Sequence, residues 1–337
     1  MAATEFRVPP PRPPKARKGT TTLALIHRMP RPVTFALAGG GAHGSVQWGL
    51  LQALAETDIR ADSLIGTSAG ALTGAIMAED PLAAVNRLAY VWSQLDLQDV
   101  LGDGWLSMLR SATSRRPGLA DNSTVSEVLS AILVARDFNE LDIPFAAVCT
   151  DLATGLPVAH EQGPLIPALL ASSAIPGVLP PVAIDGRLYI DGLASANVPT
   201  QLAVRRGAGS VVVLDTGSRA PSTEVSASAA KIAARVSKIL GDAQRRAQLQ
   251  VAAARVPVLL LPTPNDLGGT MDFRGTIEAA ASAYELGRQF LTDLSDQYPD
   301  TLKPGLYARD GSVALDPDAS NSFRPVQLTT RTAAGNR

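Results

Sequence analysis

Short apolar runs alternate with helix-like stretches through most of this 337-residue chain, and this order limits the possible folds more than any other feature. The runs are too short to be helices and are rich in β-branched residues, as in strands buried on both faces. Strands that alternate with helices form a largely parallel sheet with helices on both faces. The order therefore predicts an α/β fold. Its expected strands are 33–38, 63–66, 145–150, 188–190, 210–215 and 256–261.

The stretches between these runs show helical spacing. In 44–56, for example, Val46, Leu50 and Leu54 recur every four residues and would share one face of a helix. The other expected helices are 69–78, 81–95, 122–136, 164–172, 199–206, 226–254 and 276–296.

Composition narrows the class of protein. The chain is 46% hydrophobic and only 18% charged, which favours one compact fold, and its net charge of −1 argues against nucleic-acid partners. Cys149 is the single cysteine and cannot form an intramolecular disulfide, as expected for a reducing compartment. No signal-peptide pattern and no apolar run of membrane-spanning length is present. We expect a cytoplasmic protein, with contact to a membrane surface as a further option.

The ends of the chain differ from its centre. Residues 1–31 hold seven basic residues against Glu5 and are rich in proline, which predicts a disordered tail or a weak contact with anionic lipid headgroups. Residues 298–337 lack periodicity and are expected to form a loop or tail. The catalytic domain would then span 32–297. Within it, 97–120 mixes apolar and basic residues without a period, as in a flap or an ordinary surface excursion.

A glycine cluster, GGGAHG at 39–44, follows the first expected strand. Gly39, Gly41 and Gly44 formally match the dinucleotide-binding fingerprint. That fingerprint also needs an acidic residue at the end of the second strand, where this chain has a second glycine motif instead. Nucleotide binding is therefore disfavoured.

The second motif is Gly66-Thr67-Ser68-Ala69-Gly70, placed between a strand and a small-residue helix. A serine on such a turn is held with its hydroxyl exposed, and a Cβ at either flanking glycine would clash with the neighbouring strand and helix. Acyl transfer also needs backbone N–H groups aimed at the oxyanion, which Gly40 and Gly41 could supply beside Ser68. The alternative is a turn that only packs helix against sheet.

The choice of base is limited by three histidines, His27, His43 and His160. None lies beyond residue 160, so the order serine, acid, histidine cannot be met with an acid near residue 191. A carboxylate must then be considered, and Asp191 follows an expected strand that could deliver it beside Ser68. An Asp-Gly pair is most often only a turn, so a structural role for Asp191 stays open.

At this point the sequence resembles the patatin-like phospholipases over about 34–216. Four ordered blocks carry the resemblance, namely 39–44, 66–70, 171–177, and Asp191-Gly192 with Asn197 and Pro199. The resemblance implies a three-layer α/β/α fold, a Ser68–Asp191 dyad without histidine, and no metal or cofactor. It places the oxyanion hole in the loop of Gly39, Gly40 and Gly41, and its supporting glycines are Gly44, Gly66, Gly70 and Gly192.

Two positions depart from the family pattern. His43 stands where Arg or Lys is common, and Leu193 replaces a glycine that commonly follows the Asp-Gly pair. Leu193 would change the floor of the site and the shape of the substrate it accepts. The segment 171–177 would line the site through Ser172 and Pro176, or form a structural turn.

The resemblance implies a serine acyl hydrolase that cleaves phospholipid or lysophospholipid esters through an acyl-enzyme on Ser68. One alternative is an acyltransferase, although the related carrier transacylases have histidine directly before the nucleophile, where this chain has Thr67. The other is a non-catalytic regulatory protein on the same fold. The expected partner is a lipid or ester substrate, and the oligomeric state is not readable from the sequence.

Overall fold

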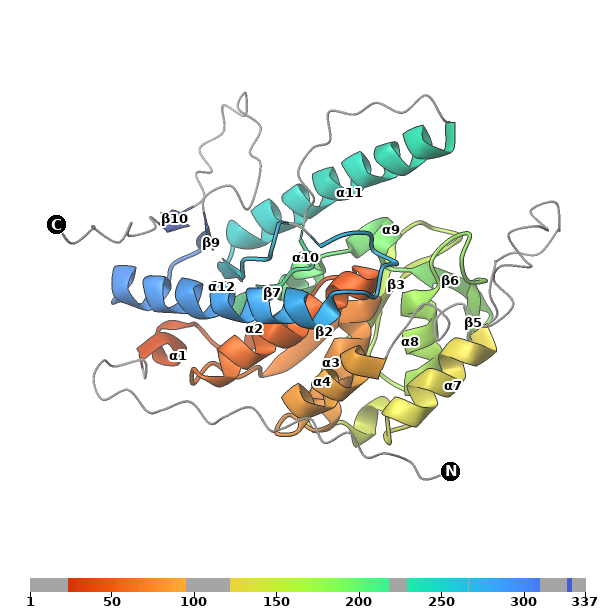
Figure 1. Cartoon of the computed structure of the whole chain (residues 1–337), viewed down its shortest axis with the longest axis horizontal. Coiled ribbons are helices and arrows are strands. Elements are labelled where there is room, and N and C mark those ends of the chain that lie inside the picture. The colour runs from red at the N-terminus through yellow and green to blue at the C-terminus, as the bar shows by residue number, and fades with distance from the viewer. Residues whose placement is uncertain (1–23, 95–121, 218–228, 266, 310–325, 329–337) are drawn as a thin grey trace.

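A single mixed sheet forms the centre of the protein, as seen in the computed structural model (Figure 1), which describes residues 24–94, 122–217, 229–265, 267–309 and 326–328. The predicted flap, 97–120, lies outside these residues. In chain order the strands are β1 (Val33–Leu37), β2 (Ser63–Thr67), β3 (Phe145–Asp151), β4 (Pro157–His160), β5 (Val182–Ile184), β6 (Arg187–Asp191), β7 (Ser210–Leu214), β8 (Pro257–Leu260), β9 (Gly305–Arg309) and β10 (Val326–Leu328).

The strand order is β10–β9–β8–β7–β1–β2–β3–β6–β5, and β4 also pairs with β3. Every pairing from β10 to β3 is parallel, whereas β4, β5 and β6 join in antiparallel fashion at the β3 end. The sheet is therefore mainly parallel, as the alternating pattern predicted. All six expected strands form, and β4, β5, β9 and β10 are additions.

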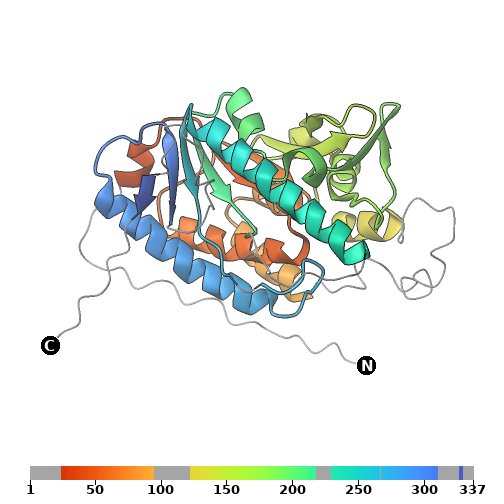
Figure 2. The same cartoon turned by 90° about the horizontal axis from the view of Figure 1, so that it is seen from above.

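Helices cover both faces of this sheet. They are α1 (Ala24–Arg28), α2 (Ser45–Ala55), α3 (Ala69–Glu79), α4 (Ala84–Gln94), α7 (Asn122–Ile132), α8 (Leu165–Ser173), α9 (Leu193–Ala196), α10 (Thr200–Arg205), α11 (Ala229–Ala253) and α12 (Thr276–Gln297), with short 3₁₀ turns at Gly41–Gly44 and Phe138–Glu140. Figure 2 shows α11 and α12 on opposite sides of the sheet. This is the predicted three-layer α/β/α arrangement.

Alternation along the strands divides the interior into two cores. Phe35 and Leu37 of β1 point to the side of α2, α4 and α12, where they join Leu50 and Phe290. Ala36, between them, points the other way, toward α10 and α11, into a core that contains Leu249. The strand β1 therefore buries both of its faces, which explains its largely apolar sequence.

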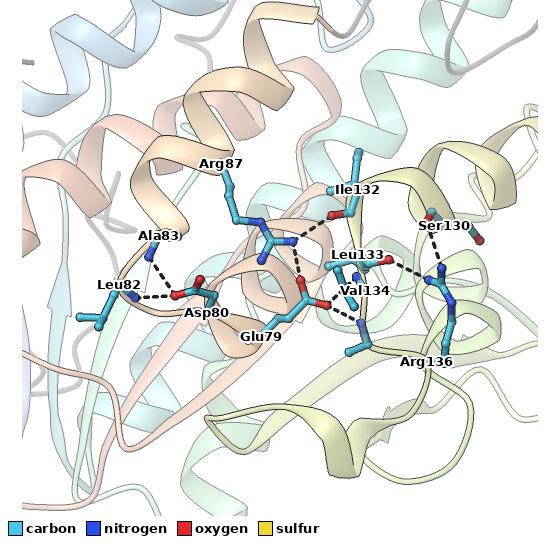
Figure 3. Close-up of polar contacts among 11 residues, drawn as sticks. Glu79, Asp80, Leu82, Ala83, Arg87, Ser130, Ile132, Leu133, Val134 and Arg136 are labelled. Carbon is cyan, nitrogen blue, oxygen red and sulfur yellow. Dashed lines mark hydrogen bonds and ion pairs between the residues drawn. The ribbon is translucent and has the colours of Figure 1, made fainter. Parts of the chain in front are cut away.

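The C-terminal end of α3 is fastened by Glu79 (Figure 3). Its Oε1 accepts hydrogen bonds from the backbone N–H groups of Val134 (2.8 Å) and Ala135 (2.5 Å), and its Oε2 pairs with Arg87 of α4. Arg87 also donates to the carbonyl of Ile132 at the end of α7 (2.8 Å). These contacts fix the far end of the helix that begins directly after Ser68.

Two stretches that the sequence placed in tails belong to the folded domain. In 24–31, Leu25 and Met29 are buried, and Arg28 donates to the carbonyl oxygen of Ser295 at 2.9 Å. The high basic and proline content of 1–31 hides these few apolar anchors, because composition is averaged over the segment. Near the other end, β9 extends the sheet and buries Leu306 and Tyr307, so the prediction of a loop or tail is wrong there.

Candidate active site

Ser68 occupies a strained turn between β2 and α3. Its backbone has φ 55° and ψ −124°, a combination that residues with side chains rarely adopt. The side chain is nearly buried and lines a cavity. A sharp strand-to-helix turn of this kind presents a serine hydroxyl away from the sheet, as expected for a nucleophile.

The glycines on either side of Ser68 make this turn possible. A Cβ at Gly66 would lie 2.3 Å from the carbonyl oxygen of Gly70, and a Cβ at Gly70 would lie 2.4 Å from that of Leu37. Both distances are far inside van der Waals contact, and both neighbours are backbone atoms. The predicted steric reason for the two glycines is confirmed.

The register of β3 brings Asp191 to the level of Ser68. Residue Thr67 of β2 pairs with Val148, and Asp191 at the end of β6 pairs with the next residue, Cys149. Gly192 allows the chain after β6 to approach β3 closely, since a Cβ at Gly192 would lie 2.5 Å from the carbonyl oxygen of Val148. Residues 123 positions apart in sequence are thus placed together by one strand between them.

The Asp191 carboxyl is fully buried, and its two oxygens differ. Oδ1 accepts a hydrogen bond from the N–H of Leu193 at 2.8 Å, whereas Oδ2 has no partner within ordinary hydrogen-bonding geometry. Burial raises the pKa of Asp191 from 3.8 to about 7, against opposing effects of the Leu193 N–H and the Ser68 side chain. The group is therefore a base of near-neutral strength beside the Ser68 hydroxyl.

The glycine loop contributes unused N–H groups. The N–H of Gly39 donates to the carbonyl of Asn197 (3.1 Å), so Gly39 cannot serve as an oxyanion donor and that part of the prediction is corrected. Among the residues that the structure describes, the N–H groups of Gly40 and Gly41 meet no acceptor. The N–H of Ala69, the first residue of α3, also meets no acceptor among these residues. The sequence analysis did not propose Ala69, although the residue after such a serine commonly donates its N–H to an oxyanion.

Neighbouring residues hold this loop in place. Thr216 donates from Oγ1 to the carbonyl of Gly39 at 2.7 Å, and the N–H of Ala42 donates to the carbonyl of Thr270 at 2.8 Å. Gly41 has φ +57°, and a Cβ there would lie 2.3 Å from the same Thr270 oxygen. Gly44 is also required, because its Cβ would lie 2.7 Å from the Trp92 ring. The loop is therefore preorganised rather than free to collapse.

A cavity of about 370 Å³ opens in front of Ser68. Ile175, Val178, Leu193 and Met271 give it apolar walls, so the departure at Leu193 from the family pattern places an apolar side chain at the cavity. On the opposite side α11 contributes its polar wall. The residues from this helix are Ser237, Lys238, Gly241, Asp242 and Arg245.

The wall from α11 is fixed to the sheet by a buried ion pair. Arg245 donates from Nε to Oδ2 of Asp215 at 2.9 Å, and both side chains line the cavity. Asp215 directly follows β7, next to the glycine loop. Asp215 and Arg245 lie 30 residues apart, and no local sequence pattern indicates that they pair, so this ion pair was not predicted.

Only one histidine reaches the site. His43 lines the cavity, as its place in the glycine loop allowed. His160 instead sits in β4 against the Tyr189 ring, with centroids 4.8 Å apart, and burial lowers its pKa. His27 lies in α1 and is exposed. Among the three histidines, His43 is therefore the alternative to Asp191 as a base.

Ser172 supports the strained turn rather than lining the cavity. Its hydroxyl donates to the carbonyl of Val148 (2.6 Å) and accepts from the N–H of Ser68 (2.9 Å), and the side chain is fully buried. Pro176 is not among the lining residues either, whereas its neighbours Ile175 and Val178 are. Of the two readings of 171–177, the structural one holds for Ser172.

Replacing Ser172 with alanine tests this support. Two buried backbone groups lose their partner, so we expect Ser172→Ala to lower the free energy of unfolding by about 1–3 kcal/mol and kcat by about tenfold as the turn shifts. The control is Ser173→Ala, one residue along the same helix, whose side chain makes no hydrogen bond among the described residues. Equal stability and turnover in the two variants, measured by urea unfolding and ester hydrolysis, would contradict the role.

Within the described residues, no group of three or more His, Cys, Asp and Glu side chains is placed to hold a metal ion. The helices of those same residues include none with the length and apolar character needed to cross a bilayer.

Comparison with known proteins gives a consistent match. A family model described as patatin-like phospholipase matches residues 35–204. Patatin-like phospholipase domain-containing protein 7 of Rattus norvegicus is 33% identical over 211 residues, covering 62% of this chain and 15% of that protein. An uncharacterised NTE family protein of Mycobacterium bovis is 34% identical over 160 residues, covering 48% and 42%.

Patatin-like phospholipase domain-containing protein 6 of Homo sapiens is 32% identical over 190 residues, covering 56% of this chain and 13% of that protein. The chain thus spans about 15% or less of the length of these mammalian relatives. Among solved structures, VipD from Legionella pneumophila aligns over 78% of this chain and 67% of its own, at 14% identity and a TM-score of 0.44.

The match to the family model covers half of the chain, and it contains the glycine loop, Ser68 and Asp191 in the same order as the site is built. The glycine loop and Ser68 line one cavity, and the buried Asp191 lies beside Ser68. The chain belongs to the patatin-like phospholipase family.

Proposed function

We propose that this protein hydrolyses carboxylic ester bonds of lipids, with Ser68 as nucleophile and Asp191 as general base. The observation that carries the proposal is the buried Asp191 carboxyl beside the Ser68 hydroxyl, at the wall of a cavity of about 370 Å³. Serine is a weak nucleophile until a neighbouring base takes its proton. Asp191, with a pKa of about 7, is strong enough to do so near neutral pH.

The chemistry proceeds in two halves. In the first, Oδ2 of Asp191 takes the proton of Ser68 as Oγ attacks the ester carbonyl carbon, giving a tetrahedral oxyanion. Collapse of this intermediate breaks the bond to the alcohol, which leaves with the proton held by Asp191, and the acyl group stays on Ser68. In the second half, Asp191 takes a proton from water, the hydroxide adds to the acyl carbon, and Ser68 recovers that proton as the carboxylic acid leaves.

The oxyanion is stabilised by N–H groups that donate to no acceptor in the described part of the chain. Those of Gly40 and Gly41 approach from the loop after β1, and that of Ala69 lies at the start of α3. The N-terminal end of α3 adds a favourable dipole for developing negative charge. Donors of this kind contribute about 10²–10³ in turnover each, provided that they are held in place before the reaction.

The two oxygens of the Asp191 carboxyl group have different roles in this mechanism. Oδ1 is held by the Leu193 N–H, which fixes the orientation of the carboxyl group. Oδ2, without a partner, is left to exchange a proton with the Ser68 hydroxyl. One residue thus performs the orienting and base functions that a triad divides between an acid and a histidine.

The walls of the cavity favour an amphipathic substrate. Ile175, Val178 and Leu193 suit an acyl chain, whereas the ion pairs Lys238–Asp242 and Arg245–Asp215 make the wall at α11 polar. A phospholipid or lysophospholipid presents both characters in one molecule. Substrate pockets combine a mostly apolar lining with a few placed polar groups in this way.

A panel of substrates tests the proposal. Purified protein is assayed against phospholipids, lysophospholipids, triacylglycerol and short p-nitrophenyl esters, with Ser68→Ala as the blank. We expect free fatty acid from at least one phospholipid or lysophospholipid, at a rate at least about 10⁴ times that of the blank. Hydrolysis of no ester in the panel, or hydrolysis that the blank matches, would contradict the function.

A further inference from the structure

The outer face of α11 carries large apolar side chains that no other described element covers. Ile232, Val236, Ile239, Leu240 and Val251 are each between 44% and 65% exposed. Single exposed apolar residues are ordinary on a protein surface, but a row of them along one helix is not. Figure 1 shows α11 running along one side of the molecule, with its N-terminal half extending beyond the sheet.

Helical geometry places these residues on one stripe. At 100° per residue, positions 232, 236, 239 and 240 fall within a quarter to a third of the helix circumference, and Ala243, Ala247 and Val251 continue the same line. The residues that contact the domain, among them Arg245, Leu249 and Ala252, occupy the opposite side. The helix therefore has one apolar face for the core and a second for the surroundings. We call the second face, from Ile232 to Val251, the α11 stripe.

We propose that the α11 stripe docks the protein on the surface of an anionic phospholipid bilayer. An amphipathic helix lies in the headgroup region when an apolar face is flanked by basic residues. Arg235 and Arg246 border one edge of the stripe on the helical projection, and both side chains are partly exposed. This charge is complementary to anionic headgroups, which attract nearby basic side chains.

The position of the cavity supports this occupant over a protein partner. The opposite side of the same helical turns, at Ser237, Lys238 and Gly241, lines the cavity that contains Ser68. A helix with its side chains is about 10–12 Å across, so docking through the stripe would hold the cavity about one helix diameter above the lipid headgroups. The docking surface stands without the proposed function, but its use in delivering substrate rests on that function.

Vesicle binding tests the stripe without requiring activity. The full chain is mixed with extruded vesicles of phosphatidylcholine and phosphatidylglycerol in equal amounts, or of phosphatidylcholine alone, and the bound fraction is measured by flotation. We expect binding to the anionic vesicles and a loss of about tenfold or more in Leu240→Glu, which puts a charge where an apolar side chain would be buried. The matched control is Leu82→Glu, at a residue that is 97% exposed and lies outside α11.

Activity measurements on the same variants distinguish the proposed docking surface from the proposed ester hydrolysis. Leu240→Glu should hydrolyse a dissolved short ester at the wild-type rate while losing activity on vesicle phospholipid, and Leu82→Glu should keep both. Three results would overturn the docking surface: no binding of the wild type to anionic vesicles, equal binding by the two variants, or a dimer that Leu240→Glu alone dissociates. Binding that depends on Leu240 without hydrolysis of any ester would support the stripe and contradict the proposed function.

Discussion

Replacing Ser68 with alanine is expected to lower kcat for ester hydrolysis by at least about 10⁴, because no acyl-enzyme can form without the hydroxyl. The remaining side chains of the cavity are unchanged, so KM for a bound ester should change little. Rates are measured with a p-nitrophenyl ester and with the lipid substrate that the panel identifies.

The folding control for this result uses the strained backbone. Ser68 has φ 55°, where a side chain costs energy and glycine does not. Ser68→Gly should therefore be as inactive as Ser68→Ala while raising the free energy of unfolding by about 1 kcal/mol. An inactive protein that is also more stable cannot be explained by misfolding. Substantial hydrolysis by both variants would instead place the nucleophile elsewhere.

Asp191→Asn is the second large expected effect. The amide keeps an oxygen that can accept from the Leu193 N–H but cannot take the Ser68 proton, so kcat should fall by about 10³–10⁴. The control is Asp185→Asn, the same chemical change at an exposed turn between β5 and β6. Equal activity in the two variants would show that Asp191 is only a turn residue.

The pH dependence follows from the raised pKa of Asp191. The base acts as a carboxylate, so kcat/KM should fall about tenfold per pH unit below the pKa of about 7 and level off above it. The effect on stability has the opposite sign. The folded-state pKa lies above the unfolded one, so this group's contribution is complete below pH 3.8 and is lost as the pH rises to about 7.

Because the stabilising contribution of Asp191 is lost at high pH, we predict that Asp191→Asn is stable but inactive. At pH 8 the wild type must keep a charged carboxylate buried, whereas Asp191→Asn does not, so the variant should be more stable by about 2–4 kcal/mol. The difference should shrink toward pH 4. Thermal unfolding of both proteins across this range measures it, and a difference independent of pH would contradict the raised pKa.

Much of the sheet was predictable because its strands are buried on both faces. Residues such as 35–38 and 211–214 form unbroken apolar runs, which few other structures require. The glycines around Ser68 were equally informative, since a backbone oxygen occupies the space that a side chain would need. Local rules of this kind act within a few residues and can be read from the sequence.

The placement of Asp191 shows where such rules end. It was expected directly after a strand that could deliver it beside Ser68, and it does lie at the end of β6, which runs antiparallel and pairs with β3 at Cys149. The sequence did not indicate this antiparallel pairing, and the role of Asp191 as a base stays a prediction. The Asp215–Arg245 pair and the Ser172 support join segments 30 and 104 residues apart, which no local pattern could indicate.

Gly39 illustrates a different limit. It belongs to the same run as Gly40 and Gly41, and its sequence neighbours give it the same chance of offering an N–H to a substrate. Only the fold shows that this N–H already donates to Asn197, whose loop follows α9. Which donors of a glycine loop stay available depends on the segments packed around it.

The central claim is that Asp191, without help from a histidine, activates Ser68. The most direct measurement is the rate at which a fluorophosphonate labels Ser68 between pH 5 and 9 in the wild type, Asp191→Asn and His43→Ala. We expect a rate that rises with a midpoint near pH 7 in the wild type and in His43→Ala, and almost no labelling in Asp191→Asn. Labelling of Asp191→Asn at the wild-type rate, or loss of the midpoint in His43→Ala, would contradict it.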